Sequence, residues 1–369
     1  MGAEKRVLVV GGGPAALEGV LALRRLAGSR VDVTLLCDQD VFVYRPATVA
    51  EPFGLGEPLR YSLEAIAGDV GFSWRRGRLR AVDVPARQVG LEDGGTLEYD
   101  ALLLALGAAA VDAVPGAIRF AGARDVARVR GALDELSPGA PSRIACVAAP
   151  GTSWTLPVYE LALLAARWAS ERRLAVEAWV VTHEARALDV FGEQASRSIG
   201  ELLERASVRL WTGSRAVSLQ DGRLLLADEG GLPVDLAIAL PALVARPVPG
   251  LPANADGFVE VDDFGRVLGI DHVYAAGDMT ARPLKQGGLA AQQADAAASA
   301  IAAWSGAPVV PEPYRPVLRG LLVTGAGSRG LRRDAPLESM DGAPWPSQKL
   351  AARELAPYLA DHPEFLVGT

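Results

Sequence analysis

The sequence contains only two cysteines, Cys37 and Cys146, which stand far apart and without the spacing of metal ligands. We therefore expect neither a disulfide framework nor a metal site. Aromatic residues make up only 6% of the chain, and alanine is abundant, which favours closely packed helices. The formal net charge of −7 argues against a nucleic-acid partner, because phosphate binding needs clustered lysine and arginine.

Long apolar runs are also missing, since none approaches the ~18 residues that a membrane-spanning helix needs. The chain passes from MGAEKR directly into an apolar stretch, so we expect no signal peptide. These absences predict a cytoplasmic protein, with peripheral contact to a membrane as the less favoured alternative. The 369 residues suffice for two domains or one large one.

The most informative stretch is RVLVVGGGPAALEGVLALRRL, at residues 6–26. An apolar run typical of a buried parallel strand leads into three glycines and then into an apolar helical pattern. This is the context that a dinucleotide-binding GxGxxG/A motif requires, although an ordinary glycine-rich turn is the alternative. Gly11 allows the tight turn, Gly13 allows a pyrophosphate to come close, and Ala16 allows the helix to pack on the strand. Pro14 suits the first helical turn, whose free N–H groups attract phosphate.

A second strand is expected at Val31–Cys37, where a dinucleotide fold places an acidic residue that binds the adenosine ribose. Cys37 takes the usual slot, so Asp38 is either the ribose ligand or a solvated loop residue. Residues 42–54 are rich in aromatics and prolines and show no periodicity, which predicts a loop lying over a ligand.

Further elements follow the same α/β pattern. A helix is expected near residues 59–67, and buried strands at 99–107 and 272–278. A glycine-interrupted helix follows at 288–304. A second βαβ pattern starts at Arg143, with a strand at 144–148, a helix at 157–169 and a strand at 176–182.

Four signals occur in order: VVGGGPAA, YDALLLALGA, the second βαβ unit, and VYAAGD followed by a helix. Over residues 5–325 the chain thus resembles the two-dinucleotide-binding-domain flavoproteins, the pyridine nucleotide-disulfide oxidoreductase fold. The resemblance implies an α/β fold of two Rossmann-like βαβ domains with a three-layer ββα/βαβ architecture, and FAD as cofactor. The FAD-binding domain, residues 1–115 and 255–325, is split by a second dinucleotide-binding-like domain at 116–254. Residues 326–369 form a short C-terminal segment.

The resemblance also implies which residues contact FAD. Its pyrophosphate would meet the glycine turn, its adenine the backbone of Leu79, and its ribityl chain Asp278, for which a helix N-cap is the alternative role. Lys285, near flavin N1 and O2, would stabilise the charge of the reduced flavin, or it is a solvated loop lysine. The predicted FAD contacts are Gly11, Gly13, Pro14, Ala15, Ala16, Asp38, Arg45, Pro46, Leu79, Ala105, Leu106, Gly107, Gly277, Asp278, Lys285, Gln286 and Gly287, with Lys285 as the catalytic candidate.

Within the family, FVYRPA and PLKQGGLAAQQA are similar to segments of sulfide:quinone reductases, flavocytochrome c sulfide dehydrogenases and type II NADH dehydrogenases. The second βα turn departs from the nucleotide-binding pattern, because its three slots read Ala149, Gly151 and Trp154. We expect Trp154 to push the helix off the strand. Glu184 lies two residues beyond the usual ribose acid. The redox cysteines of the sulfide-oxidising relatives are missing too, and Cys146 is expected to be buried and inert.

These features predict an FAD-dependent oxidoreductase that passes electrons between a small-molecule donor and acceptor, such as a quinone-like ring, without redox cysteines. NADH and NADPH are expected to reduce the flavin slowly or not at all. Two alternatives stay open: an NAD(P)H dehydrogenase of the type II kind, and a flavin-binding protein without turnover. The second domain is expected to shape the flavin's open face, with Trp154 and Tyr159 on or near it.

The C-terminal stretch at residues 345–360 has apolar residues at helical spacing, namely Leu350, Leu355 and Leu359. Its basic content is slight, which favours packing in the core or in a homodimer over contact with a membrane.

Overall fold

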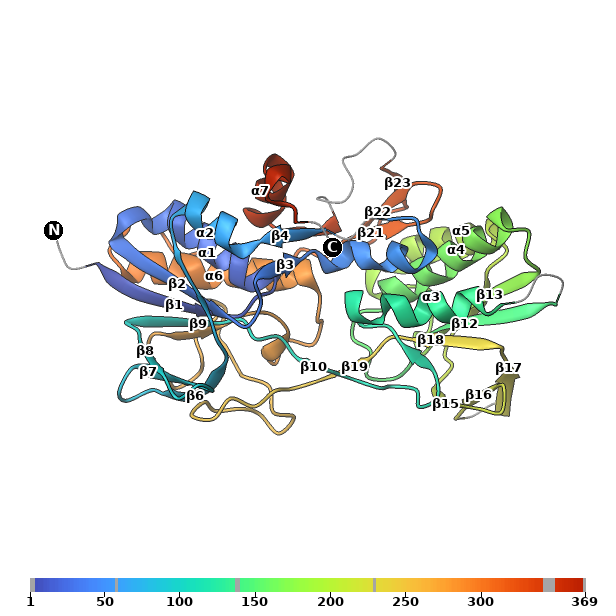
Figure 1. Cartoon of the computed structure of the whole chain (residues 1–369), viewed down its shortest axis with the longest axis horizontal. Coiled ribbons are helices and arrows are strands. Elements are labelled where there is room, and N and C mark those ends of the chain that lie inside the picture. Colours follow the sequence, from blue (N-terminus) through green and yellow to red (C-terminus); the bar gives the residue numbers. More distant parts are fainter. Residues whose placement is uncertain (1–3, 57–58, 137–139, 228–229, 341–348, 368–369) are drawn as a thin grey trace.

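The computed structural model describes residues 4–56, 59–136, 140–227, 230–340 and 349–367. These residues form two lobes that lie side by side, and each lobe is built around a five-stranded parallel sheet (Figure 1). Among the described residues, no helix is both long enough and apolar enough to cross a bilayer.

The two sheets are assembled from strands far apart in the sequence. The first sheet contains β1 (Lys5–Val10), β2 (Val31–Cys37), β5 (Ser73–Arg76), β9 (Ala101–Leu104) and β20 (Val273–Ala275). The second contains β11 (Ile118–Arg119), β12 (Ser142–Ala148), β13 (Val176–Thr182), β14 (Arg209–Trp211) and β18 (Leu236–Ala239). Their strand orders are β20-β9-β1-β2-β5 and β11-β18-β12-β13-β14. Because β20 follows the second sheet in the sequence, the first lobe is discontinuous.

Each sheet has helices on one face and a small antiparallel sheet on the other. The first sheet lies between α1 (Pro14–Ala27) with α6 (Gly287–Trp304) and the strands β6 (Leu79–Asp83), β7 (Gln88–Leu91) and β8 (Thr96–Glu98). The second lies between α3 (Val126–Asp134), α4 (Leu156–Glu171) and α5 (Glu193–Arg205) and the strands β15 (Ala216–Gln220), β16 (Arg223–Leu226) and β17 (Gly230–Pro233). The predicted three-layer architecture of two Rossmann-like units is confirmed.

The sequence of β1 shows why both faces of the first sheet are covered. Val7 and Val9 pack against the helices, whereas Leu8 and Val10 pack against the antiparallel sheet. All four side chains are buried. A strand buried on both faces needs a continuous apolar run instead of alternation, and residues 7–10 supply it.

Two strands, β10 (Ala109–Val111) and β19 (Ala242–Val244), pair antiparallel where the chain passes between the lobes (Figure 1). The domain boundaries at residues 115, 254 and 325 stay predictions. Short 3₁₀ helices are η1 (Gly28–Arg30), η3 (Ala123–Asp125), η4 (Asp189–Phe191), η5 (Gly277–Met279) and η7 (Pro363–Phe365).

The expected loop at residues 42–54 is wrong. The chain there forms β3 (Val41–Val43) and the 3₁₀ helix η2 (Arg45–Phe53). A 3₁₀ helix has three residues per turn, so its sequence lacks the 3.6-residue period of an α-helix. The side chains of Val49 and Phe53 join the core of the second lobe, so η2 ties the two lobes together.

The expected helix at residues 59–67 begins later than predicted. Residues 60–62 form β4 (Arg60–Ser62), which pairs with β3, and only then does α2 (Leu63–Val70) begin. Ser62 caps this helix by accepting a hydrogen bond from the Ala65 N–H at 3.2 Å.

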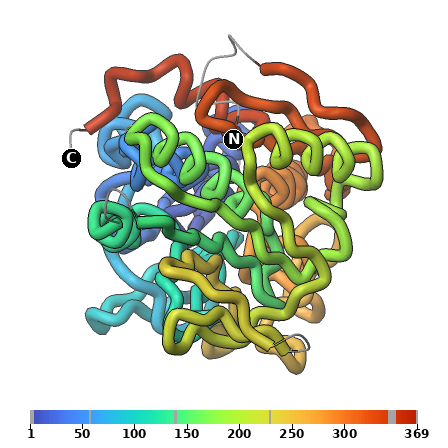
Figure 2. The backbone as a smooth tube through the Cα atoms, turned by 90° about the vertical axis from the view of Figure 1, so that its right-hand side faces the viewer, coloured from blue at the N-terminus to red at the C-terminus, as the bar shows by residue number. Residues whose placement is uncertain are grey.

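The C-terminal segment contains a small sheet and a short helix, and it lies along the same side of both lobes (Figures 1 and 2). Its elements are β21 (Arg319–Val323), β22 (Ser328–Arg332), β23 (Glu338–Ser339) and α7 (Leu355–Asp361). The helix is therefore shorter than predicted, and residues 345–348 lie outside the described part of the chain. Leu350, Leu355 and Leu359 are buried in the core of the first lobe, so the expected core packing is confirmed.

A buried carboxylate on α1 fastens the start of α7. Glu18 has no exposed surface. It accepts hydrogen bonds from the backbone N–H groups of Arg353, Glu354 and Leu355 at 2.7, 2.9 and 2.6 Å. Asp295 of α6 lies beside it. Burial and the charge of Glu18 raise the pKa of Asp295 to about 8.

This pKa makes stability depend on pH. The charged groups around Asp295 are Glu18, Arg353, Glu354 and Arg25. In the folded protein Asp295 keeps its proton up to about pH 8, whereas in the unfolded chain it loses the proton near pH ~4. The folded state thus binds more protons between these values, so stability falls as pH rises through this window. Asp295→Asn should become more stable than the wild type as pH rises from about 5 to 8, measured by urea unfolding.

The exposed substitution Glu201→Gln is the control and should leave the pH dependence of unfolding unchanged. Parallel curves for Asp295→Asn and wild type would contradict the assignment.

Candidate active site

The glycine turn after β1 lies where the chain changes direction in the first sheet. β2 lies on one side of β1 and β9 on the other, which is the switch point where ligands bind to open α/β sheets. At Gly11, whose φ is +140°, an added Cβ would lie only 2.2 Å from the carbonyl oxygen of Ala105. At Gly13, an added Cβ would meet no atom within 4 Å. The turn therefore meets backbone on one side and open space on the other.

The N-termini of two helices converge beside this space. A Cβ at Gly287, where α6 begins, would lie 3.7 Å from Cγ of Pro14, where α1 begins. The first N–H groups of α1 have no side-chain cap, because its capping residue is Gly13. Gln286 caps α6 by accepting the Leu289 N–H at 2.8 Å. Both helices thus direct the positive ends of their dipoles at one place, which suits an anion.

Asp278 follows β20 and faces the same region. It is half-buried, and no described residue donates a hydrogen bond to its carboxylate. Burial raises the pKa of Asp278, while the charges of Lys285 and Arg45 act in the opposite direction. The structure therefore brings Asp278 together with Lys285 and with Arg45 of η2, all three of which are predicted site residues. The alternative role of Asp278 as the cap of the following helix is wrong, because Gln286 caps α6.

Lys285 lies over the ring of Phe258, with Nζ 4.0 Å from the ring centroid. Its ammonium also donates a hydrogen bond to the carbonyl of Thr280. Burial lowers the pKa of Lys285, and Asp278 opposes that shift. It is thus a partly buried lysine with protein partners.

Gln293 is a site residue that the sequence reasoning missed. Its side-chain oxygen accepts hydrogen bonds from the Gly277 N–H and the Thr280 hydroxyl, both at 3.0 Å. The same side chain bonds the hydroxyl of Tyr314. Gln293 therefore fixes the turn that carries Asp278. The available signal was a glutamine within an alanine-rich buried helix, since buried polar groups need partners.

At the other end of the site, Asp38 follows β2 and accepts a hydrogen bond from Arg78 Nε at 2.8 Å. Leu79 begins β6 directly after this arginine and is half-buried. The side-chain oxygen of Gln39 lies 3.4 Å from where a Cβ of Gly12 would be. Of these residues, Gln39 lies against the glycine turn.

The turn after β12 is much longer than the turn after β1. It contains residues 149–155, against residues 11–13 in the first lobe. As predicted, α4 begins late, with Pro157 in its first turn. Trp154 does not push the helix off the strand, however, because the longer turn carries its ring to Phe191, in an edge contact with centroids 5.9 Å apart. The prediction of a displaced helix is wrong.

Tyr159 does not line an open face, contrary to the prediction. It is fully buried, and its hydroxyl donates to Glu184 Oε2 at 2.7 Å. The Thr182 hydroxyl donates to the same oxygen at 2.9 Å, and the Leu188 N–H bonds the Tyr159 hydroxyl at 3.1 Å. Glu184 is therefore engaged in packing α4 against the end of β13.

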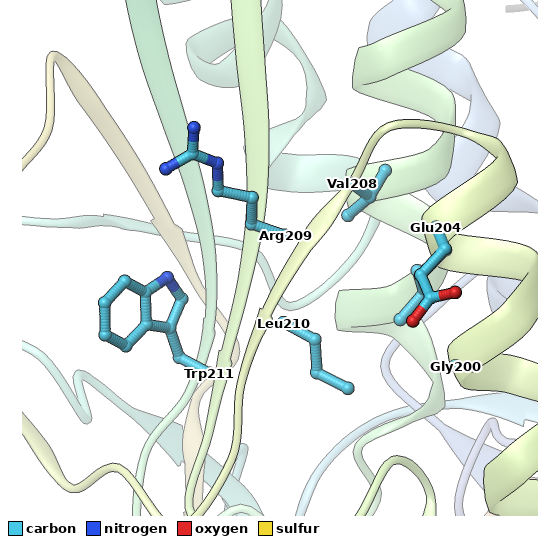
Figure 3. A pocket seen from close by; sticks show the side chains of 7 residues that line it. Gly200, Glu204, Val208, Arg209, Leu210 and Trp211 are labelled. Carbon is cyan, nitrogen blue, oxygen red and sulfur yellow. The ribbon is translucent and has the colours of Figure 1, made fainter.

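A surface hollow lies elsewhere, between α5 and β14 (Figure 3). It is open, with a volume of about 560 Å³, and Val208, Leu210 and Glu204 are among its lining residues. Arg209 and Trp211 point to the other side of the strand (Figure 3). No predicted site residue lines this hollow.

The family model of the pyridine nucleotide-disulphide oxidoreductases matches residues 5–300. The chain belongs to this family. It is an FAD-dependent oxidoreductase. The expected family and cofactor are thus confirmed.

Solved structures share the fold of this oxidoreductase. The sulfide:quinone oxidoreductase of Aquifex aeolicus is 20% identical, with a TM-score of 0.80 over 91% of this chain and 86% of that one. NDH2 of Plasmodium falciparum is 13% identical, with a TM-score of 0.71 over 99% and 95%. A ferredoxin reductase of Rhodopseudomonas palustris is 20% identical, with a TM-score of 0.70 over 89% and 82%.

The position of Gln293 yields a test in this oxidoreductase. Gln293→Met keeps the volume but removes both hydrogen bonds to the turn, each worth ~1 kcal/mol. We expect FAD to bind at least about tenfold more weakly, measured by fluorescence titration of the apoprotein.

The neighbouring Gln292 bonds the backbone of Val317 instead of the turn, so Gln292→Met is the matched control and should keep wild-type affinity. Equal affinities for both variants would show that the turn does not need Gln293.

Proposed function

We propose that this enzyme passes electrons between a small-molecule donor and a small-molecule acceptor through FAD lying across the first lobe. A quinone-like ring is the proposed acceptor, and NADH and NADPH are not efficient donors. When bound, FAD supplies the redox chemistry at its flavin ring. The chain's own residues bind it, orient it and set the charge around it.

The space beside Gly13 and the two helix N-termini support a pyrophosphate site there. A side chain is excluded at Gly11, and none fills the space at Gly13. The uncapped N–H groups of α1 are donors for phosphate oxygens. Pro14, Ala15 and Ala16 complete this proposed contact.

The remaining predicted contacts suit the other parts of FAD. The carboxylate of Asp278 accepts no hydrogen bond from a described residue. It can therefore accept hydrogen bonds from the ribityl hydroxyls of FAD. Asp38 and Leu79 border the adenosine end, and Ala105, Leu106 and Gly107 follow β9. The proposed flavin position is surrounded by Arg45, Pro46, Gly277, Lys285, Gln286 and Gly287. Lys285 and the N-terminus of α6 supply positive potential for a cofactor that gains negative charge on reduction.

The turn between β12 and α4 is the main reason why we propose that a nicotinamide is not the donor. A nucleotide site needs a tight bend and free N–H groups close behind the strand. Here seven residues separate β12 from α4, against three between β1 and α1, so the second turn is not the short bend of a nucleotide site. The acid that could hold a ribose, Glu184, already accepts hydrogen bonds from Tyr159 and Thr182.

Cysteine chemistry is not part of this proposal. Cys37 and Cys146 are both buried and unpaired. Burial raises the pKa of each thiol, which disfavours the reactive thiolate. A quinone-like acceptor is suggested by the likeness in fold to a sulfide:quinone oxidoreductase.

Asp278 gives a direct test of the FAD position. A hydrogen bond to a charged group contributes about 1.5–3 kcal/mol. Asp278→Ala should therefore weaken FAD binding at least about tenfold. Unchanged affinity in an equilibrium titration would refute the ribityl contact, and the exposed Asp256→Ala serves as control.

The proposed electron carriers are tested by anaerobic stopped-flow mixing of the FAD-loaded enzyme with NADH or NADPH, and of the dithionite-reduced enzyme with a quinone, which we expect to reoxidise the flavin. We expect slow or absent reduction by either nicotinamide, with dithionite as the positive control. Saturable reduction faster than about 1 s⁻¹, the low end of ordinary turnover, would favour an NAD(P)H dehydrogenase. Absence of reoxidation by the quinone, together with no reduction by either nicotinamide, would favour a flavin-binding protein without turnover.

A further inference from the structure

A buried ion pair joins the C-terminal segment to the second lobe. Glu160 of α4 is fully buried, and Lys349 exposes only 6% of its side chain. The ammonium lies 2.6 and 2.7 Å from the two carboxylate oxygens, and the Val323 N–H donates to Oε1 at 2.8 Å. Burial raises the pKa of Glu160 and lowers that of Lys349, and each charge opposes the shift of the other. We call this pair the clasp.

The residue after the clasp contacts the first lobe. The Leu350 N–H donates to the hydroxyl of Tyr44 at 2.8 Å. Leu350 Cδ1 lies 3.0 Å from where a Cβ of Gly287 would be, so a side chain at residue 287 would press against the segment. Within two residues, the chain therefore passes from a buried anchor in one lobe to two contacts in the other.

Both contacts adjoin the proposed flavin position. Tyr44 directly precedes Arg45 and Pro46, and Gly287 directly follows Lys285 and Gln286. A shift of Leu350 would break its hydrogen bond to the Tyr44 hydroxyl and open the space beside Gly287. The position of this one leucine is thus linked to both segments.

We propose that Lys349 is a positioning residue of the flavin site. Through its pair with Glu160, it holds Leu350 against Tyr44 and Gly287, so that the C-terminal segment forms one wall of the site and couples it to the second lobe. Two apolar side chains at residues 160 and 349 could fill the same volume. They would not hold the C-terminal segment in a single position along α4, as the ion pair does through both carboxylate oxygens of Glu160. The proposal rests on the proposed FAD position.

The test compares Lys349→Met with a control in the FAD-loaded protein. The control is Arg197→Met, which breaks an exposed ion pair with Glu193 in the same lobe. Three quantities are measured: the dissociation rate of FAD, iodide quenching of flavin fluorescence, and chymotrypsin cleavage after Leu355 or Tyr358 by mass spectrometry. For Lys349→Met we expect FAD to dissociate at least about tenfold faster, stronger quenching and faster cleavage, with no change in the control.

A double variant, Glu160→Met with Lys349→Met, separates positioning from stability. Because it leaves no unpaired buried charge, its thermal stability should return toward the wild-type value. We expect its quenching and cleavage to stay high. Wild-type quenching and cleavage in the double variant, or in Lys349→Met itself, would overturn the proposal. If the wild-type protein bound no FAD, the proposed function would fail, whereas cleavage would still report on the clasp.

Discussion

The site depends on one close approach between two backbone segments. Gly11 lies so near the carbonyl of Ala105 that no side chain fits. Its N–H donates to the carbonyl of Leu36, and the Ala105 N–H donates to that of Val10. The ends of three parallel strands are thereby locked together, and α1 starts at the point where they meet. The open space at Gly13 and the approach of Pro14 to the start of α6 lie directly beside this contact.

The two lobes repeat one architecture but differ at the turn that follows the first strand. In the first lobe a three-residue glycine turn leads directly into α1, whose start has no side-chain cap. In the second, the longer turn places Trp154 on Phe191, and Glu184 is occupied by Tyr159. The second lobe thus keeps the fold of a nucleotide-binding unit, while the acidic residue Glu184, which could hold a ribose, serves the packing of the lobe itself.

The sequence was most informative where the evidence is local. The glycine turn, the buried run of β1 and the proline at the start of α4 all act within a few residues, and each element was predicted. The 3₁₀ helix at Arg45–Phe53 was not predicted, because its apolar side chains are buried against the second lobe, and no pattern near these residues indicates that contact. Trp154 was misjudged for a related reason: its partner Phe191 lies far along the chain.

Two buried glutamates, Glu18 and Glu160, show why sequence patterns over a few residues cannot predict contacts between distant parts of the chain. Glu18 is the fifth residue of α1, and Glu160 is the fifth residue of α4. Both helices follow a βα turn, and both glutamates are fully buried. A buried carboxylate needs partners, and each finds them in the C-terminal segment: backbone N–H groups for Glu18 and Lys349 for Glu160. The same position in the two repeated units thus binds neighbouring parts of one segment, residue 349 and residues 353–355, which is how the end of the chain comes to join the two lobes.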